Sequence, residues 1–184
     1  MFKDVILPIK NVPVIILANS SWYIFHYRSF LIKKLKKKYS KVIAICPRDA
    51  YSPKLEKFCH LIKWTNQREN KNNIFLTFLS FLKLFLIIQK NKPLLIHSHT
   101  LKINLFASLI SSILNIPCII SFAGMGRLSN GTRKSYFLLK IIIYLINFFS
   151  LFNFSMKKFH HHKDKRVIFI FQNEKDKELY ERLI

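Results

Sequence analysis

The sequence predicts an α/β fold in which helices cover both faces of a parallel β-sheet, giving three layers. Short apolar runs alternate with longer helical patterns along the chain, which is typical of parallel strands joined by crossover helices. The chain has 184 residues, of which 51% are hydrophobic and 22% charged. This length allows one well-buried core and is too short for two comfortable domains.

Six apolar runs are the predicted strands. Pro47 ends the second of them. The predicted strands are 14–18, 42–46, 60–63, 93–96, 117–120 and 167–171.

Helical patterns occupy the segments between these strands. Ser20 or Ser21 is predicted to cap a helix that begins near Trp22. On that helix we expect Ile24, Tyr27, Leu31 and Leu35 to share the buried side. Further helices are predicted over 52–59, 74–89, 105–114 and 134–149 and from residue 174 onward, with a polar loop over 66–73 and a basic connector over 160–166.

The formal net charge is +22, from 31 Lys and Arg against 9 Asp and Glu. Such a charge favours anionic partners, namely nucleic acid, acidic lipid or a phosphate-bearing substrate, and does not choose among them. Cys46, Cys59 and Cys118 form no Cys-x-x-Cys pair, so neither a zinc site nor a disulfide framework is indicated. We expect Cys46 and Cys118 to be core residues in a reducing cytoplasm.

Two apolar segments resemble membrane spans. Segment 74–88 is shorter than the roughly 20 residues that a span needs and contains Lys83. Segment 136–154 is closer in length, but Lys140 and two asparagines interrupt it. We predict that both are helices buried against a sheet or lying on a bilayer surface, with a true span at the second as the alternative.

In an open parallel sheet, ligands bind beyond the carboxyl ends of the strands. Asn19, Ser20, Ser21 and Trp22 follow the first predicted strand. They either cap the helix or offer free N–H groups to a phosphate or a sugar hydroxyl. The absence of a Gly-x-Gly-x-x-Gly pattern there argues against a nicotinamide dinucleotide site. The other strand-end segments to inspect are 47–49, 97–99, 124–126 and 172–173.

His97 and His99 are the most chemically distinctive pair. A histidine that titrates near neutrality can orient or deprotonate a sugar hydroxyl. We predict from the alternation of side chains that the two point to opposite sides of the strand, so that one faces the cleft. The alternative is one histidine in the core and one exposed to solvent.

Three further features of the sequence give weaker evidence of a functional site. Gly124 and Gly126 predict a turn with positive φ or a close approach to a ligand. Asn173 with Asp176 is a helix-capping pattern first and a candidate site second. The run 160–162 of three histidines is more typical of a solvated basic loop than of a metal site, and we predict no metal ion and no cofactor.

At these loops the sequence resembles family 4 glycosyltransferases, especially the bacterial branch that builds O-antigen, capsule or N-glycan precursors on lipid carriers. Four segments carry the resemblance in chain order. They are Asn19 to Ile24 with Arg28; His97 to Asn104, which includes Lys102; Ser121 to Gly126; and Phe171 to Asp176.

The resemblance implies the N-terminal, acceptor-side Rossmann-like half of a GT-B fold over residues 1–184, with the C-terminal donor-binding domain absent. It implies a metal-independent, retaining transfer from a nucleotide sugar to an acceptor hydroxyl. His99 corresponds to the family's active-site histidine. The substrate-binding residues that the resemblance implies are Asn19, Ser20, Ser21, Trp22, His97, Lys102, Gly124, Gly126 and Asn173.

The implied partners are a nucleotide sugar, a lipid-linked or saccharide acceptor, the anionic inner face of the cytoplasmic membrane and a separately encoded C-terminal domain. The alternatives are an inactive truncated remnant and a basic module that binds membrane or nucleic acid. The chain contains no recognised nucleic-acid-binding motif, and its lysines are scattered over several predicted helices, so nucleic acid is not an expected partner.

Overall fold

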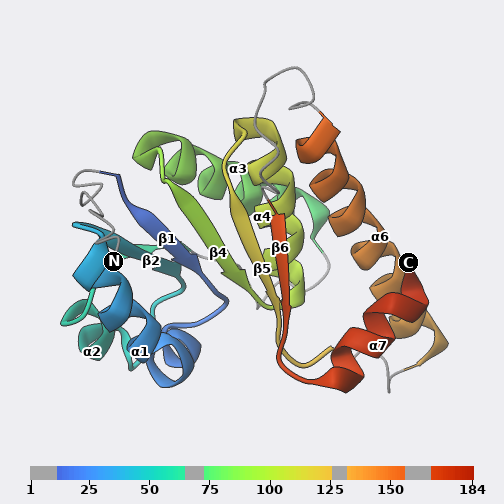
Figure 1. The fold of residues 1–184 in the computed structure, drawn as a ribbon, viewed down its shortest axis with the longest axis horizontal. Helices are drawn as coiled ribbons and strands as arrows, with labels where there is room; N and C mark the ends of the chain where they lie inside the picture. Colours follow the sequence, from blue (N-terminus) through green and yellow to red (C-terminus); the bar gives the residue numbers. More distant parts are fainter. Residues whose placement is uncertain (1–11, 65–72, 126–131, 156–166) are drawn as a thin grey trace, which may run out of the picture.

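The computed structural model describes residues 12–64, 73–125, 132–155 and 167–184, and they form a parallel sheet with helices on both faces (Figure 1). This confirms the predicted fold class. Most of the loop predicted over 66–73, Gly126, the connector 160–166 and the three histidines 160–162 lie outside the described residues.

The sheet has six strands in the order β3-β2-β1-β4-β5-β6, and every neighbouring pair is parallel. After β1 the chain adds β2 and β3 on one side of it, and it then returns to place β4 on the other side of β1. The carboxyl ends of β1 and β4 therefore form a topological switch point, where open α/β sheets bind ligands. The strands are β1 (Val14–Leu17), β2 (Val42–Cys46), β3 (His60–Lys63), β4 (Leu95–His99), β5 (Cys118–Phe122) and β6 (Val167–Phe171).

The helices agree with the predicted pattern and differ at their ends. The helix predicted over 52–59 is only five residues long, and the fourth strand begins at Leu95 and runs through His99. Pro93 is excluded from that strand since it has no N–H to donate to a ladder. The helices are α1 (Ser21–Lys38), α2 (Ser52–Glu56), α3 (Ile74–Asn91), α4 (Leu101–Leu114), α6 (Arg133–Ser155) and α7 (Glu174–Leu183).

Two apolar cores lie on opposite faces of the sheet. Successive strand side chains point to opposite faces, so Ile15 and Leu17 join the core under α3, α4 and α6, whereas Ile16 joins the core under α1 and α2. Figure 1 shows the two helical layers. Each fully buried isoleucine contributes about 1.5–3 kcal/mol relative to an exposed one. Burial on both faces explains why the strand runs are continuously apolar.

The predicted buried side of α1 is partly wrong. Ile24 is buried as expected, but Tyr27 is 57% exposed and Ile32 takes the next buried position. Tyr27 packs instead against the rings of Trp22 and Tyr23, with centroids 5.7 and 5.3 Å away. An aromatic ring at helical spacing therefore belongs here to a surface cluster rather than to the core.

Helices α3 and α6 are each buried along one narrow stripe. Leu84 and Ile88 anchor α3, and Leu139, Ile143 and Ile146 anchor α6. Within the described residues, these two helices are long and apolar enough to cross a membrane, and only 17% of each apolar window is buried. The buried stripes belong to the same core as the strands, which is one of the two arrangements predicted for these helices, and the outer faces of both helices remain apolar and exposed.

Candidate functional site at the carboxyl ends of the strands

A hollow of about 600 Å³ opens at the carboxyl edge of the sheet. Its walls come from the segments that follow β1, β2, β4 and β5, which is the switch-point position expected for this topology. The lining residues are Asn19, Ser20, Trp22, Tyr23, Asp49, Ala50, Tyr51, Thr100 and Ala123. Asn19, Ser20 and Trp22 were expected at this place from the sequence, and the structure brings them together.

The first turn of α1 is capped within the protein. Ser20 Oγ accepts the Tyr23 N–H at 3.2 Å. The Asp49 carboxylate accepts the Trp22 N–H at 2.8 Å through one oxygen and the Tyr51 N–H at 2.8 Å through the other. An anion is favourable at a helix N-terminus, and here Asp49 supplies it. The capping interpretation of Ser20 therefore holds, and these N–H groups are not open to a phosphate.

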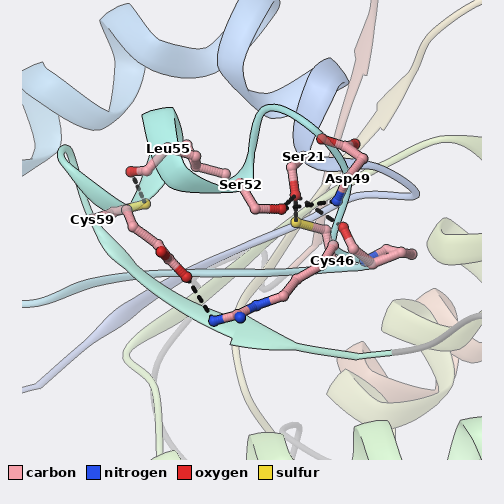
Figure 2. Close-up of polar contacts among 9 residues, drawn as sticks. Ser21, Cys46, Asp49, Ser52, Leu55 and Cys59 are labelled. Carbon is pink, nitrogen blue, oxygen red and sulfur yellow. Dashed lines mark hydrogen bonds and ion pairs between the residues drawn. The ribbon is translucent and has the colours of Figure 1, made fainter.

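Ser21 lies in the core rather than at the hollow. Its hydroxyl donates to the Pro47 carbonyl at 2.9 Å and lies 2.8 Å from Ser52 Oγ and 3.4 Å from Cys46 Sγ (Figure 2). Burial raises the pKa of the Cys46 thiol to about 12, so this thiol stays protonated. Ser21 thus fastens α1 to the end of β2 and the start of α2. The structure does not bring it to the hollow, where the resemblance had placed a substrate contact.

His97 and His99 lie on the same side of β4. Their ring centroids are 4.3 Å apart, and both side chains are buried, His99 completely. The prediction that they point to opposite sides is wrong, because residues two apart on a strand share a face. Both point to the α1 side of the sheet, opposite to Ile96, which lies in the core beneath α4.

Hydrogen bonds from α1 and β5 fix this histidine pair. Arg28 of α1 donates its Nε–H to His99 Nδ1 at 3.4 Å and an Nη2–H to Tyr23 Oη at 3.1 Å. His97 Nε2 lies 2.8 Å from Ser121 Oγ on β5. Because Nδ1 of His99 accepts, its neutral ring carries the hydrogen on Nε2. No partner for Nε2 is present among the described residues.

The environment keeps both imidazoles neutral. Burial, and after it the neighbouring His97 imidazole and the Arg28 guanidinium, which disfavour a second positive charge, lower the pKa of His99 from 6.5 to about 2. Burial and then Arg28 lower the pKa of His97 to about 4. A ring with so low a pKa is a poor proton acceptor at neutral pH. His99 is therefore arranged to donate a hydrogen bond from Nε2.

The turn from β4 into α4 is strained and internally braced. Thr100 has φ +75° and ψ 143°, a region that a β-branched residue rarely adopts. Behind it, Ser98 Oγ donates to Asn104 Oδ1 at 2.8 Å, and Asn104 Nδ2 donates to the Ser121 carbonyl at 2.9 Å. These buried contacts hold the ends of β4 and β5 together and oppose the strain at Thr100.

The glycine turn after β5 is held by α7. Gly124 has the predicted positive φ, +71°. The Gly124 and Met125 N–H groups each donate to the buried Asp176 carboxylate at 3.2 Å. Asn173 caps α7, since its Oδ1 accepts the Asp176 N–H at 2.8 Å. Gly124 and Asn173 thus help to hold the turn after β5 against the start of α7. Neither residue lines the hollow.

Lys102 lies in the first turn of α4, away from the lining of the hollow. Its Nζ is 5.8 Å from the Phe106 ring centroid, and partial burial lowers its pKa. In the described ranges no group of three His, Cys, Asp or Glu side chains could hold a metal ion.

Tyr51 was not singled out from the sequence as a site residue, and Tyr23, Arg28 and Ser121 were named only within the segments that carry the family resemblance. Asp49 lay within a strand-end segment that was inspected, and its position after β2 was the available signal. Arg28 and Ser121 contact the histidines through packing between elements, so the resemblance included both residues without showing their partners.

Comparison with solved structures supports the fold. The chain is similar to Anabaena HepE in complex with UDP, with a TM-score of 0.55 and 15% identity over 88% of this chain and 44% of HepE. For HepE in complex with UDP and glucose the TM-score is 0.54, with 15% identity over 92% and 50% of the two chains. The chain thus spans half or less of the length of HepE. No curated protein matches the sequence.

The predicted Rossmann-like N-terminal half of a GT-B fold is therefore confirmed by the strand order and by these neighbours. A family model described as glycosyl transferase 4-like matches residues 14–155, which include every strand from β1 to β5 and the hollow. This chain belongs to the glycosyl transferase 4-like family.

Proposed function

We propose that this chain is the acceptor-side half of a glycosyltransferase that moves a sugar from a nucleotide sugar to a saccharide or lipid-linked acceptor. The observation that carries the proposal is the buried, neutral His99, whose Nε2–H has no described partner, beside a hollow at the switch point. The family assignment supports transferase chemistry. The HepE complexes with UDP and with UDP and glucose support a nucleotide-sugar donor.

In this proposal His99 acts as a hydrogen-bond donor. Its Nε2–H orients a sugar hydroxyl at the reacting centre, and Arg28 positions the ring by holding Nδ1 as an acceptor. In the present state Thr100 follows His99 in the chain, and the Tyr23 ring lies 5.6 Å from the imidazole. Both residues line the hollow. Contact between substrate and Nε2 therefore requires a rearrangement of this wall.

We propose that a second unit, encoded downstream or separately, binds the nucleotide. The chain spans 44% of HepE, and the described residues that line the hollow include no lysine or arginine to hold a diphosphate. The decisive experiment is co-expression with the product of the adjacent reading frame, followed by mass spectrometry of acceptors incubated with nucleotide sugars. Transfer by the pair supports the proposal. A pair that binds nucleotide sugar and glycosylates no acceptor contradicts it.

We propose further that the protein docks on an anionic membrane to reach a lipid-linked acceptor. The exposed faces of α3 and α6 carry large apolar side chains, including Phe75, Phe78 and Phe137, each more than half exposed. The net charge of +22 complements anionic headgroups. Apolar burial and electrostatic attraction together are the two contributions that hold a peripheral protein at an interface.

Replacing both Phe75 and Phe78 with aspartate is expected to reduce binding to phosphatidylglycerol vesicles by at least about 100-fold, since each buried phenylalanine contributes about 1.5–3 kcal/mol. Co-sedimentation at low salt measures the bound fraction. Phe30→Asp is the matched control, because Phe30 is 73% exposed on α1, across the sheet from α3. Equal losses in the two variants, or no binding of the unmodified chain, contradict docking through α3.

A further inference from the structure

We propose that Thr100 is a strained gate beside His99, and that the gate opens when Thr100 relaxes to an ordinary N-cap conformation with an extended φ. Opening gives substrate access to the His99 Nε2–H, so the role of the gate in catalysis rests on the proposed function. The evidence comes from the backbone of Thr100, the start of α4 and the residues that stand between His99 and the hollow.

The backbone of Thr100 has a conformation that a β-branched residue rarely adopts. Its φ is +75° and its ψ is 143°, a region that is open to glycine and strained for threonine. Among the described residues Lys92 and Asn115 also have positive φ, but both are left-handed C-cap residues at the ends of α3 and α4, where this conformation is common. Thr100 instead begins a helix, where an extended φ is usual. The strain in this residue therefore favours a change of its conformation.

The start of α4 lacks the cap with which α1, α3 and α7 begin. In those three helices the N-cap residue has a φ between −92° and −163°, and its side-chain oxygen accepts the N–H three residues later. Thr100 makes no such hydrogen bond, although threonine is a favoured N-cap residue. In the relaxed conformation Oγ1 of Thr100 accepts the Ile103 N–H. Relaxation thus removes the strain and satisfies a donor of the first turn that the closed state leaves without a cap.

Tyr23, the other residue of the wall beside His99, is anchored. Its Oη accepts hydrogen bonds from Arg28 Nη2 at 3.1 Å and from Gln172 Nε2 at 3.4 Å, so α1 and the end of β6 both hold it. Its ring also packs with its centroid 5.3 Å from that of Tyr27. Of the two wall residues, Thr100 is therefore the one that moves.

The neighbours of Thr100 confine the movement to one residue. Ser98 Oγ and Asn104 Oδ1 are joined at 2.8 Å, and Asn104 Nδ2 holds the Ser121 carbonyl on β5 at 2.9 Å. These bonds keep β4 and α4 in place while Thr100 changes. In the open state His99 Nε2, which is buried without a partner in the described residues, gains one in water or a substrate hydroxyl. A local change between two arrangements of one turn is sufficient for a gate.

Solvent exchange of the His99 Nε2–H proton measures the opening, and it can be followed by NMR on the ¹⁵N-labelled 184-residue chain. The Trp64 Nε1–H is the internal reference, because it is buried and donates to the Ser80 carbonyl at 2.8 Å. We expect the His99 proton to exchange faster than the Trp64 proton, since the gate opens without unfolding. Thr100→Gly removes the strain from the closed state and should slow exchange at His99 at least about fivefold.

Lys92→Gly is the matched control. It also places glycine at a positive φ, but before β4, at the opposite end of that strand from His99, so it stabilises the fold without acting on the gate. Thr100→Pro fixes φ near about −65° and cannot close, so the His99 signal should be lost to rapid exchange. If the proline variant does not fold, the two glycine variants still decide the question.

Three results would overturn the proposal: no slowing at His99 in Thr100→Gly, equal slowing in Thr100→Gly and Lys92→Gly, or exchange at His99 as slow as at Trp64 in the unmodified chain. None of these rates involves a sugar donor or acceptor. A failure here therefore leaves the transfer assay on the co-expressed pair as an independent measure of the proposed function.

Discussion

Acidification between about pH 6 and 5 is expected to lower the free energy of unfolding by about 2 kcal/mol through His97 and His99 alone. Both rings are neutral in the folded protein, with pKa values lowered to about 4 and about 2, whereas the unfolded chain has ordinary values near 6.5. Below pH 6.5 the unfolded state therefore binds more protons, so stability is present above that pH and falls as the pH decreases. Each histidine contributes a slope of up to about 1.4 kcal/mol per pH unit.

Chemical denaturation at several pH values measures this slope. The double variant His97→Gln and His99→Gln should lose most of the dependence between pH 6 and 5, although its stability at pH 7 also changes. His60→Gln is the control, because His60 is exposed on β3 and its removal should leave the slope intact. A double variant with the slope of the unmodified chain would show that the imidazoles are not buried in neutral form.

Much of the fold was predictable since each strand carries its own signal. The run Val42–Cys46 is apolar at every position because both faces of β2 are covered, and Pro47 marks its end. Its parallel pairing with β1 and β3 follows from the helical crossovers between these runs, through α1 and the short α2, because parallel strands cannot be joined by tight hairpins. The prediction that Tyr27 is buried was wrong because its ring packs on neighbouring rings at the surface. Helical spacing alone does not distinguish such a position from a buried one.

The candidate site was predictable only in outline. The strand-end rule located Asn19, Trp22 and His99 correctly at one edge of the sheet. It could not show that Asp49 would cap α1, or that Asp176, 52 residues after Gly124, would occupy the glycine turn. Such pairings depend on how α1, α7 and the loops pack, and so they arise only in the folded chain. The prediction that the two histidines point to opposite sides was wrong, because residues two apart on a strand share a face and the two rings lie together.

His99→Ala is expected to lower kcat/KM of the reconstituted transferase by about 100- to 1,000-fold, the usual cost of deleting one preorganised donor in a site shielded from water. The expected role is donation from Nε2, because Arg28 occupies Nδ1 and the lowered pKa keeps the ring neutral. His60→Ala, which removes an exposed imidazole, should retain full activity.

The two possible roles of His99, hydrogen-bond donor and general base, predict different activities for His99→Gln and different pH profiles of kcat/KM. If His99 donates, His99→Gln should recover part of the lost activity through its amide N–H, and the pH profile of kcat/KM should have no limb near pH 6.5 that disappears in the variant. If His99 instead removes a proton, the glutamine variant should be as inactive as the alanine variant, since an amide cannot accept that proton. The depressed pKa favours the first outcome, because a ring that loses its proton at about pH 2 has little affinity for one taken from a hydroxyl. Steady-state rates of the unmodified protein, His99→Ala and His99→Gln from about pH 5 to 9 separate the two mechanisms. If His99→Gln is no more active than His99→Ala, His99 acts as a base and not as a hydrogen-bond donor.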